Sequence, residues 1–324
     1  MKTHNNQIPI FYTVDDAYIP FLAVSIASLI DNSSKENEYL IKILYTNITD
    51  EHIQKIKALE TENVKIEFVN FTSQIESVKD KLHTRDYYSN TTYFRLFLPE
   101  VYKELDKAVY IDSDTVVVTD IADLYNIDLD TDLIGGVPDG AVQTVPIFQE
   151  YVEKVVGVED YNNYFNAGIL LMNFEELRKT NFQDKFLYLL GTVKFTVAQD
   201  QDYLNRICKG RVKIIDSGWD AMPMEPLKLP DEDLKILHFN LGAKPWHHDN
   251  ILYDEYFWKY AKQTEFLDEI NQIKASYTDE DRFNDDATTS NLIATAKKES
   301  DCVGDDRNKK KTGMRIFHLN HKKD

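Results

Sequence analysis

Two carboxylates stand one residue apart at the end of an apolar run, in residues 109–118, VYIDSDTVVV. At this spacing Asp112 and Asp114 can both reach one hard divalent cation, and such a cation can bridge the oxygens of a diphosphate. Ligands of open α/β sheets bind just outside the carboxyl ends of strands, where this pair would lie. The run therefore predicts a site for a metal and a nucleotide. Its structural alternative is an acidic turn that closes a strand.

The same run is compatible with a second chemistry. Asp112-x-Asp114-x-Val116 after an apolar strand also fits the signature of haloacid-dehalogenase phosphatases, in which the first aspartate is the nucleophile. That motif usually opens its fold, whereas about 110 residues precede it here, and no later acidic pair stands obviously at a strand end. A phosphatase is therefore the weaker alternative.

A histidine and a lysine follow another apolar run, in residues 238–247, HFNLGAKPWH. His238 would end the strand formed by LKIL, and Lys244 lies in a loop shaped by glycine and proline. Together they supply a metal ligand and a cation for phosphate, both of which a doubly charged leaving group needs. We expect Lys244 to be an exposed loop residue that contributes little to folding. Without the DSD pair, a structural histidine is the commoner interpretation.

Three polar segments lie between these motifs: GGVPDG with Asp139, YFNAGIL with Asn166 and Gly168, and AQDQDYL with residues 199–202. Asn, Asp and Gln side chains read sugar hydroxyls through paired hydrogen bonds, and Gly168 would let a ligand approach the backbone. These segments therefore predict contacts with a sugar.

Each of the aspartates also has a structural interpretation. Asp200 or Asp202 could cap the helix that follows. Asp15 in TVDDAY could bond a base or ribose, or it could cap the next helix. Both interpretations stay open at this level.

Short β-rich runs alternate with segments of helical periodicity through the first 120 residues. The strands and helices that they form must position the polar side chains described above. This alternation predicts a parallel sheet wrapped by helices, an α/β fold. A short helix is expected at 92–98, and further strands at 133–137 and 168–172. The expected early strands are 8–14, 38–46, 64–70 and 107–112, with helices at 17–30 and after residue 50.

Composition and charge exclude several classes of protein. With 324 residues, 43% hydrophobic and 12% aromatic, the chain can bury a large core and is not collagen-like or largely disordered. A formal charge of -18 repels nucleic acid. Cys208 and Cys302 form no CxxC pair, which argues against a disulfide framework or a thiolate zinc site. No apolar stretch reaches the roughly 20 residues of a membrane span, and the polar start differs from a signal peptide. We expect a soluble cytoplasmic protein.

The C-terminal region changes character. Residues 278–306 carry nine acidic and three basic side chains and show no clear period, so we expect a poorly ordered linker. Residues 307–324 carry seven Lys or Arg against one Asp. Such a basic tail can contact an anionic membrane surface peripherally, or it can simply keep the terminus solvated.

The ordered set TVDDAY, TTYFRLFLPE, VYIDSDTVVV, YFNAGILLMN, QDQDYLN and HFNLGAKPWH resembles bacterial family 8 glycosyltransferases over about residues 7–260. The resemblance implies a GT-A fold, with a Rossmann-like nucleotide-binding sheet flanked by helices. Together with the change in composition, it indicates a catalytic domain at 1–275 and an acidic linker and basic tail at 276–324, expected as a helical, partly disordered C-terminal extension. It also implies a retaining enzyme that uses Mn²⁺, or else Mg²⁺, and moves galactose or glucose from a UDP-hexose donor. The acceptor would be a glycan, a glycolipid or a glycoprotein.

The resemblance also assigns roles residue by residue. Asp112, Asp114 and His238 match the metal ligands. Gln201, Asp200 and Lys244 match residues at the reacting sugar and diphosphate. Residues implied at the donor are Thr13, Asp15, Tyr18, Arg95, Asp112, Ser113, Asp114, Asp139, Asn166, Ala167, Gly242 and Lys244.

Two departures and one alternative accompany this assignment. The family often has Asn where Ala17 stands, and Gly where Leu241 stands, which leaves Gly242 one position later. A non-catalytic nucleotide-sugar-binding protein of the same fold is the main alternative. Because the Gln201 amide is a poor nucleophile, we expect substitution on one face of the sugar rather than a covalent intermediate.

Overall fold

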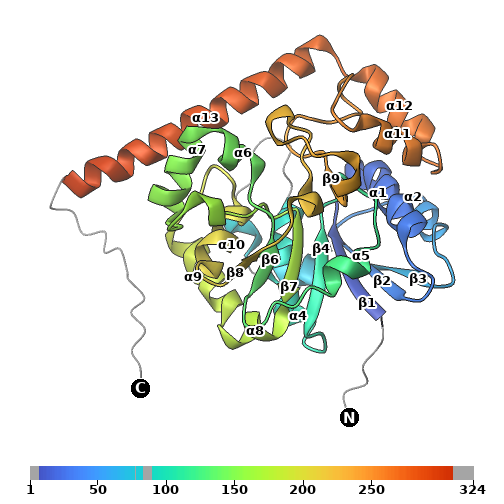
Figure 1. Ribbon diagram of the computed structural model, residues 1–324, viewed down its shortest axis with the longest axis horizontal. Coiled ribbons are helices and arrows are strands. Elements are labelled where there is room, and N and C mark those ends of the chain that lie inside the picture. The colour runs from blue at the N-terminus through green and yellow to red at the C-terminus, as the bar shows by residue number, and fades with distance from the viewer. Residues whose placement is uncertain (1–6, 77, 83–89, 309–324) are drawn as a thin grey trace.

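A seven-stranded sheet forms the centre of the protein in the computed structural model, which describes residues 7–76, 78–82 and 90–308 (Figure 1). Its strand order is β3-β2-β1-β4-β7-β6-β8. The strands are β1 (Gln7–Thr13), β2 (Glu38–Tyr45), β3 (Val64–Asn70), β4 (Lys107–Ile111), β6 (Ile134–Gly136), β7 (Ile169–Asn173) and β8 (Val212–Ile214), while β5 (Thr115–Val117) and β9 (Ile236–His238) form a separate pair.

Helices cover both faces of the sheet (Figure 1). They are α1 (Ile19–Asn32), α2 (Asp50–Lys57), α3 (Thr72–Ile75), α4 (Leu98–Val101), α5 (Ile121–Tyr125), α6 (Gly140–Thr144), α7 (Pro146–Tyr151), α8 (Phe174–Lys179), α9 (Phe182–Thr192), α10 (Asp200–Cys208), α11 (Asp254–Ala261), α12 (Leu267–Ser276) and α13 (Asp279–Asn308). The expected α/β class is therefore confirmed. The short helix expected at 92–98 is a 3₁₀ helix, η3 (Asn90–Leu96), followed by α4.

The core has two halves because successive side chains of a strand point to opposite faces. In β1, Ile10 and Tyr12 join the buried cluster that contains α1 and α11, whereas Phe11 joins the cluster on the other face with α8 and α9. All three side chains are completely buried. Strands buried on both faces read as continuous apolar runs, which is why the sequence identified them.

One strand runs antiparallel to its neighbours. The parallel sheet predicted from the first 120 residues is confirmed by the parallel pairing of β3, β2, β1 and β4, whereas β7, whose direction was not predicted, pairs antiparallel with both β4 and β6. An apolar run indicates a strand but not the direction in which that strand runs. The direction of β7 depends on the path of the chain through α6 and α7. The reversal places residues 166–168, which precede β7, beside the residues that follow the carboxyl end of β4, since Ile111 pairs with Ile169.

The small β5·β9 pair joins the two sharpest sequence motifs. Thr115 of β5 pairs with His238 of β9, and the Phe239 amide donates to the Asp114 carbonyl at 2.9 Å. Backbone pairing therefore brings DSD and HFNLGAKPWH together across about 125 residues of sequence.

The expectation of a poorly ordered linker at 278–306 is wrong, because α13 spans Asp279–Asn308 and packs along α7 (Figure 1). Leu292 packs against the core, and Ala296 and Ser300 are completely buried. Spaced four residues apart, these three residues form one narrow stripe. The small side chains of Ala296 and Ser300 let the helix approach closely, but they give a weak hydrophobic period. The basic tail lies beyond the described residues except for its first two positions. Within the described residues, no helix is both long and apolar enough to cross a membrane.

Candidate active site

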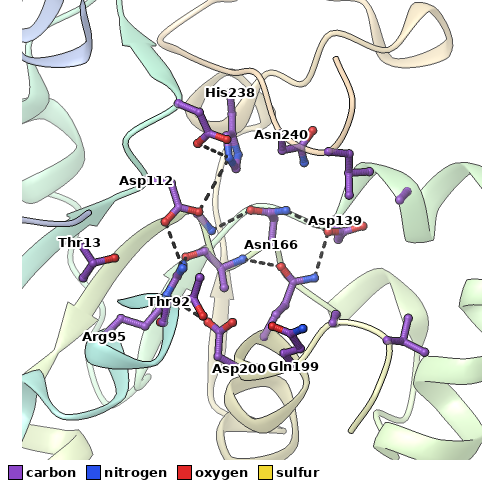
Figure 2. A pocket seen from close by; sticks show the side chains of 18 of the residues that line it. Thr13, Thr92, Arg95, Asp112, Asp139, Asn166, Gln199, Asp200, His238 and Asn240 are labelled. Atoms are coloured by element: carbon purple, nitrogen blue, oxygen red, sulfur yellow. Dashed lines mark hydrogen bonds and ion pairs between the residues drawn. The ribbon is translucent and has the colours of Figure 1, made fainter. Parts of the chain in front are cut away.

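A pocket opens at the edge of the sheet where β1, β4 and β6 end and β7 begins (Figure 2). Its wall contains every predicted site residue except Gly242: Thr13, Asp15, Tyr18, Arg95, Asp112, Ser113, Asp114, Asp139, Asn166, Ala167, Asp200, Gln201, His238 and Lys244. At the position before Gly242, Leu241 lines the pocket with a φ of 51°, in the left-handed region that favours glycine.

Asp112, Asp114 and His238 form a candidate metal centre. One ligand atom from each lies within 4.8 Å of the others. His238 Nε2 is 3.4 Å from Asp114 Oδ1 and 3.9 Å from Asp112 Oδ2. Two carboxylate oxygens and an imidazole nitrogen suit a divalent ion such as Mn²⁺. The donor set therefore fits a divalent metal.

The other ring nitrogen of His238 fixes its orientation. Nδ1 lies 2.8 Å from Asp220 Oδ1, and both side chains are buried. A carboxylate behind a ligating histidine sets its tautomer and aims the remaining nitrogen, so Nε2 faces the two aspartates. Burial alone would lower the pKa of His238, but Asp220 and Asp114 raise it to about 10. Sequence reasoning missed Asp220, which lies in an unremarkable SGWD turn.

Gly168 has a further role beside the one predicted. A Cβ atom there would lie 2.2 Å from His238 Cε1 and 2.9 Å from Asp112 Oδ2. The glycine therefore makes room for the metal-site side chains themselves, in addition to bordering the pocket.

Arg95 connects the metal centre to the sugar-contact candidates. It is 3% exposed, and its guanidinium lies 3.1 Å from both Asp112 Oδ1 and Asp200 Oδ2 while donating to the Ala167 carbonyl (Figure 2). It also lies over the Tyr110 ring, 4.3 Å from its centroid. Burial raises the pKa of Asp200 to about 6, although Arg95 opposes the shift.

Asp139, Asn166 and Gln201 form one hydrogen-bonded network. Asp139 Oδ2 accepts from Asn166 Nδ2 at 2.9 Å and from Gln201 Nε2 at 3.0 Å, while its Oδ1 caps α6. Gln201 Oε1 accepts from the Ala167 amide at 2.9 Å. Asp139 is therefore an N-cap as well as a pocket residue, and both ends of the Gln201 amide are held. The proposed caps at Asp200 and Asp202 are not found, because Gln199 occupies the cap position.

Lys244 is buried, so the expectation of an exposed loop lysine is wrong. It is 3% exposed, and its ammonium pairs with Asp114 Oδ2. The nitrogen also lies 5.4 Å from the Trp246 ring centroid and 5.9 Å from that of Tyr18. Loss of this cation would remove one of the two basic side chains that lie beside the partly buried Asp114 carboxylate, so Lys244 contributes to folding as well as to the charge of the site. Together with His238, it holds the pKa of Asp114 well below its usual range despite burial.

The first turn after β1 supplies a further polar wall. Thr13 Oγ1 hydrogen bonds the Tyr110 hydroxyl at 2.8 Å. Asp15 Oδ1 is buried and accepts no hydrogen bond from any described residue. It caps η1 (Asp16–Tyr18) by position, without a side-chain hydrogen bond. That oxygen is available to a hydroxyl or amide of a ligand.

Comparisons with known proteins agree with this geometry. The model of Glycosyl transferase family 8 matches residues 9–250. A candidate glycosyltransferase of Haemophilus influenzae is 32% identical over 255 residues, covering 74% of this chain and 72% of the relative. General stress protein A of Bacillus subtilis is 27% identical, covering 75% of this chain and 89% of its own. Lipopolysaccharide 1,2-glucosyltransferase of Escherichia coli K12 is 26% identical, covering 73% and 72%.

Solved structures share the fold. The galactosyltransferase LgtC, solved with donor and acceptor sugar analogues, is 26% identical with a TM-score of 0.66, covering 80% of this chain and 96% of its own. The bifunctional glycosyltransferase WbbM gives a TM-score of 0.74 at 23% identity, over 85% of this chain and 53% of that chain. These neighbours confirm the GT-A architecture.

Proposed function

Because the chain belongs to Glycosyl transferase family 8, we propose that it moves galactose or glucose from a UDP-hexose to an acceptor hydroxyl with retention of anomeric configuration. The observation that carries the proposal is the convergence of Asp112, Asp114 and His238 beside Lys244 in one pocket. A diphosphate leaving group needs this combination of metal ligands and a fixed cation. Family membership also removes the phosphatase alternative.

The metal site would hold Mn²⁺, or else Mg²⁺, through Asp112, Asp114 and His238. When bound, the ion supplies Lewis-acid stabilisation of the diphosphate. Asp220 keeps the His238 imidazole aimed at that position. Lys244 places its ammonium next to a metal ligand, where it can stabilise negative charge that grows on the departing UDP.

The proposed reaction breaks the bond between the anomeric carbon and the diphosphate oxygen, and the electron pair leaves with UDP. The acceptor oxygen forms the new bond on the same face, and its proton passes to the leaving phosphate. The fixed Gln201 amide supports this route, because its oxygen already accepts a hydrogen bond from Ala167 and is not positioned as a free nucleophile. Gln201 and Asp200 would orient the hexose and stabilise its positive character.

The acceptor would be a hydroxyl of a glycan, a glycolipid or a glycoprotein, and the proposed location is the cytoplasm. The experiment that tests the donor is a panel of UDP-sugars with and without Mn²⁺, reading UDP release, because water can replace the acceptor. Dominant release from UDP-glucose or UDP-galactose would identify the donor, and an α-configured first product would support retention. A non-catalytic binder would bind a UDP-hexose and release nothing.

A further inference from the structure

We propose that Gln199 is a specificity-determining residue, whose side-chain amide oxygen accepts a hydrogen bond from a hydroxyl of the donor hexose. The inference rests on the proposed function and deepens it, because it names a residue that reads the sugar beside Asp200 and Gln201. The sequence predicted a sugar contact for the segment 199–202 as a whole, and the family resemblance gave Gln199 no role of its own.

The backbone of Gln199 adopts a conformation that its side chain disfavours. Its φ is 49° and its ψ is -115°, which matches the first central position of a type II′ turn. The Gln201 amide donates to the Ala198 carbonyl at 3.0 Å and closes that turn. Glycine is the usual residue there, so a glutamine at this position stores strain.

The surrounding structure holds this turn in place. Asp202 is completely buried, and its Oδ2 accepts from the Ala198 amide at 3.0 Å. The same carboxylate accepts from the hydroxyls of Tyr151, at 2.8 Å, and Tyr164, at 2.6 Å. Asp202 thus connects Ala198, the residue before Gln199, to α7 and to Tyr164 in the segment that precedes β7. The strain persists because these contacts determine the path of the chain.

The side chain of Gln199 lines the pocket and lacks a protein partner for its oxygen. The residue is 4% exposed, and its Oε1 is buried with no hydrogen bond to any described residue. In Figure 2 its amide lies beside the Asp200 carboxylate. A buried carbonyl oxygen without a donor is unfavourable in the folded protein, unless a ligand supplies one.

Strain and an unsatisfied oxygen therefore coincide on one pocket residue. Both would be relieved by glycine, which fits the backbone and removes the oxygen. A glutamine at this position is explained if its oxygen meets a hydroxyl of the bound sugar. A side-chain amide oxygen can accept from such a hydroxyl, and losing one such partner in a buried site costs specificity for the sugar that carries it.

The test compares Gln199→Met and Gln199→Gly with the wild type by calorimetric titration of UDP, UDP-glucose and UDP-galactose in the presence of Mn²⁺. The methionine variant keeps the volume and the strain but loses the acceptor, whereas the glycine variant loses both. We expect either variant to bind the preferred UDP-hexose about tenfold more weakly and to bind UDP as the wild type does. We also expect the melting temperature of Gln199→Gly to rise.

Asn181→Gly is the matched control, because Asn181 is exposed and has a φ of 54° away from the pocket. This variant should bind both UDP and UDP-hexose as the wild type does. Equal UDP-hexose affinity in wild type and Gln199→Met would overturn the inference while leaving the proposed function intact. A wild type that binds neither UDP nor any UDP-hexose would instead overturn the proposed function, and this inference with it. Parallel losses for UDP and UDP-hexose would also overturn it, because they would indicate general damage to the site.

Discussion

Gly168 shows how one missing side chain shapes the candidate metal centre. Replacing it with alanine should push the His238 imidazole out of position, because the added Cβ would lie 2.2 Å from His238 Cε1. We expect the affinity for Mn²⁺ to fall about 10- to 100-fold, as when an orienting contact of a metal ligand is lost. Titration calorimetry measures this directly. Gly191→Ala in α9 is the control, since no other side chain among the described residues comes within 4 Å of its added Cβ, and it should bind Mn²⁺ normally. Undiminished affinity in Gly168→Ala would contradict the close packing.

Asp200 makes stability depend on pH in a defined direction. The pKa of Asp200 in the folded state is about 6, above the ordinary 3.8, so ionisation of this carboxyl destabilises the folded state. The destabilisation is complete above about pH 6 and disappears below about pH 4. Lowering the pH from 7 to 5 should therefore raise the unfolding free energy of the wild type by about 1 kcal/mol relative to Asp200→Asn. Urea unfolding at both pH values, with EDTA present, measures the difference in unfolding free energy between wild type and Asp200→Asn. A difference that does not change with pH would show that the carboxylate is not desolvated.

The sequence predicted the site residues that directly follow a strand. It did not predict the residues that hold those side chains in place. Asp112, Asp114, His238 and Lys244 follow apolar runs, so their types and positions indicated the site. Asp220 contacts His238 only because the chain folds them together, and their spacing in the sequence does not predict that contact. The burial of Lys244 was missed for the same reason, because a loop flanked by glycine and proline looks exposed until its partner is known.

At the scale of elements, α12 and Tyr277, the residue that follows it, hold the loop that carries Lys244. The Lys274 ammonium donates to the carbonyls of Pro245, at 2.9 Å, and His248, at 3.0 Å. The Tyr277 ring stacks on His247 with centroids 3.8 Å apart. These contacts come from residues beyond the part of the chain that the family model matches. We infer that they position Lys244.

Lys274→Met should therefore raise the KM for the donor about tenfold, corresponding to about 1.4 kcal/mol, with a smaller change in kcat. Lys274→Arg should restore most of the affinity, because a guanidinium can still donate to two carbonyls. Steady-state UDP release gives both parameters. Lys259→Met is the control, since that lysine is exposed on α11 and lies 3.7 Å from Asp31. If the Met and Arg variants lose affinity equally, the carbonyl contacts do not position the loop.

The direction of β7 was not predictable, and α13 differs from the sequence-based expectation, both for identifiable reasons. The direction of β7 is set by the chain path through α6 and α7, and hydrophobic runs carry no information on direction. The helix α13 is held by the narrow stripe at Leu292, Ala296 and Ser300, whereas the acidic residues around it resemble those of a disordered linker. Six strands of the central sheet were predicted to within a few residues, because each contains an apolar run, whereas β8 was not predicted, since its three residues are only partly buried or exposed.

For the whole molecule, we expect the pocket to work without the basic tail. Among the residues that the structure describes, Leu292 is the last that lines the pocket, so truncation after Asp306 should leave UDP-sugar hydrolysis intact. If the tail contacts anionic membrane, each Lys or Arg near the surface contributes about 1 kcal/mol. Vesicles of phosphatidylserine should then bind the full chain at low salt, with binding weakened by salt and by truncation. Binding that responds to neither change would exclude membrane contact by the tail.

The central claim is that Asp112, Asp114 and His238 hold the metal on which hexose transfer depends. The most direct measurement is Mn²⁺-dependent UDP release from UDP-glucose and UDP-galactose by wild type, Asp112→Asn and Asp114→Asn, with Asp130→Asn as a control at an exposed position. We expect the first two variants to lose Mn²⁺-dependent release by about 100-fold or more while remaining folded, because each loses an anionic oxygen ligand. The control should match the wild type. Release that persists in Asp112→Asn and Asp114→Asn, or that is indifferent to EDTA in the wild type, would contradict the account.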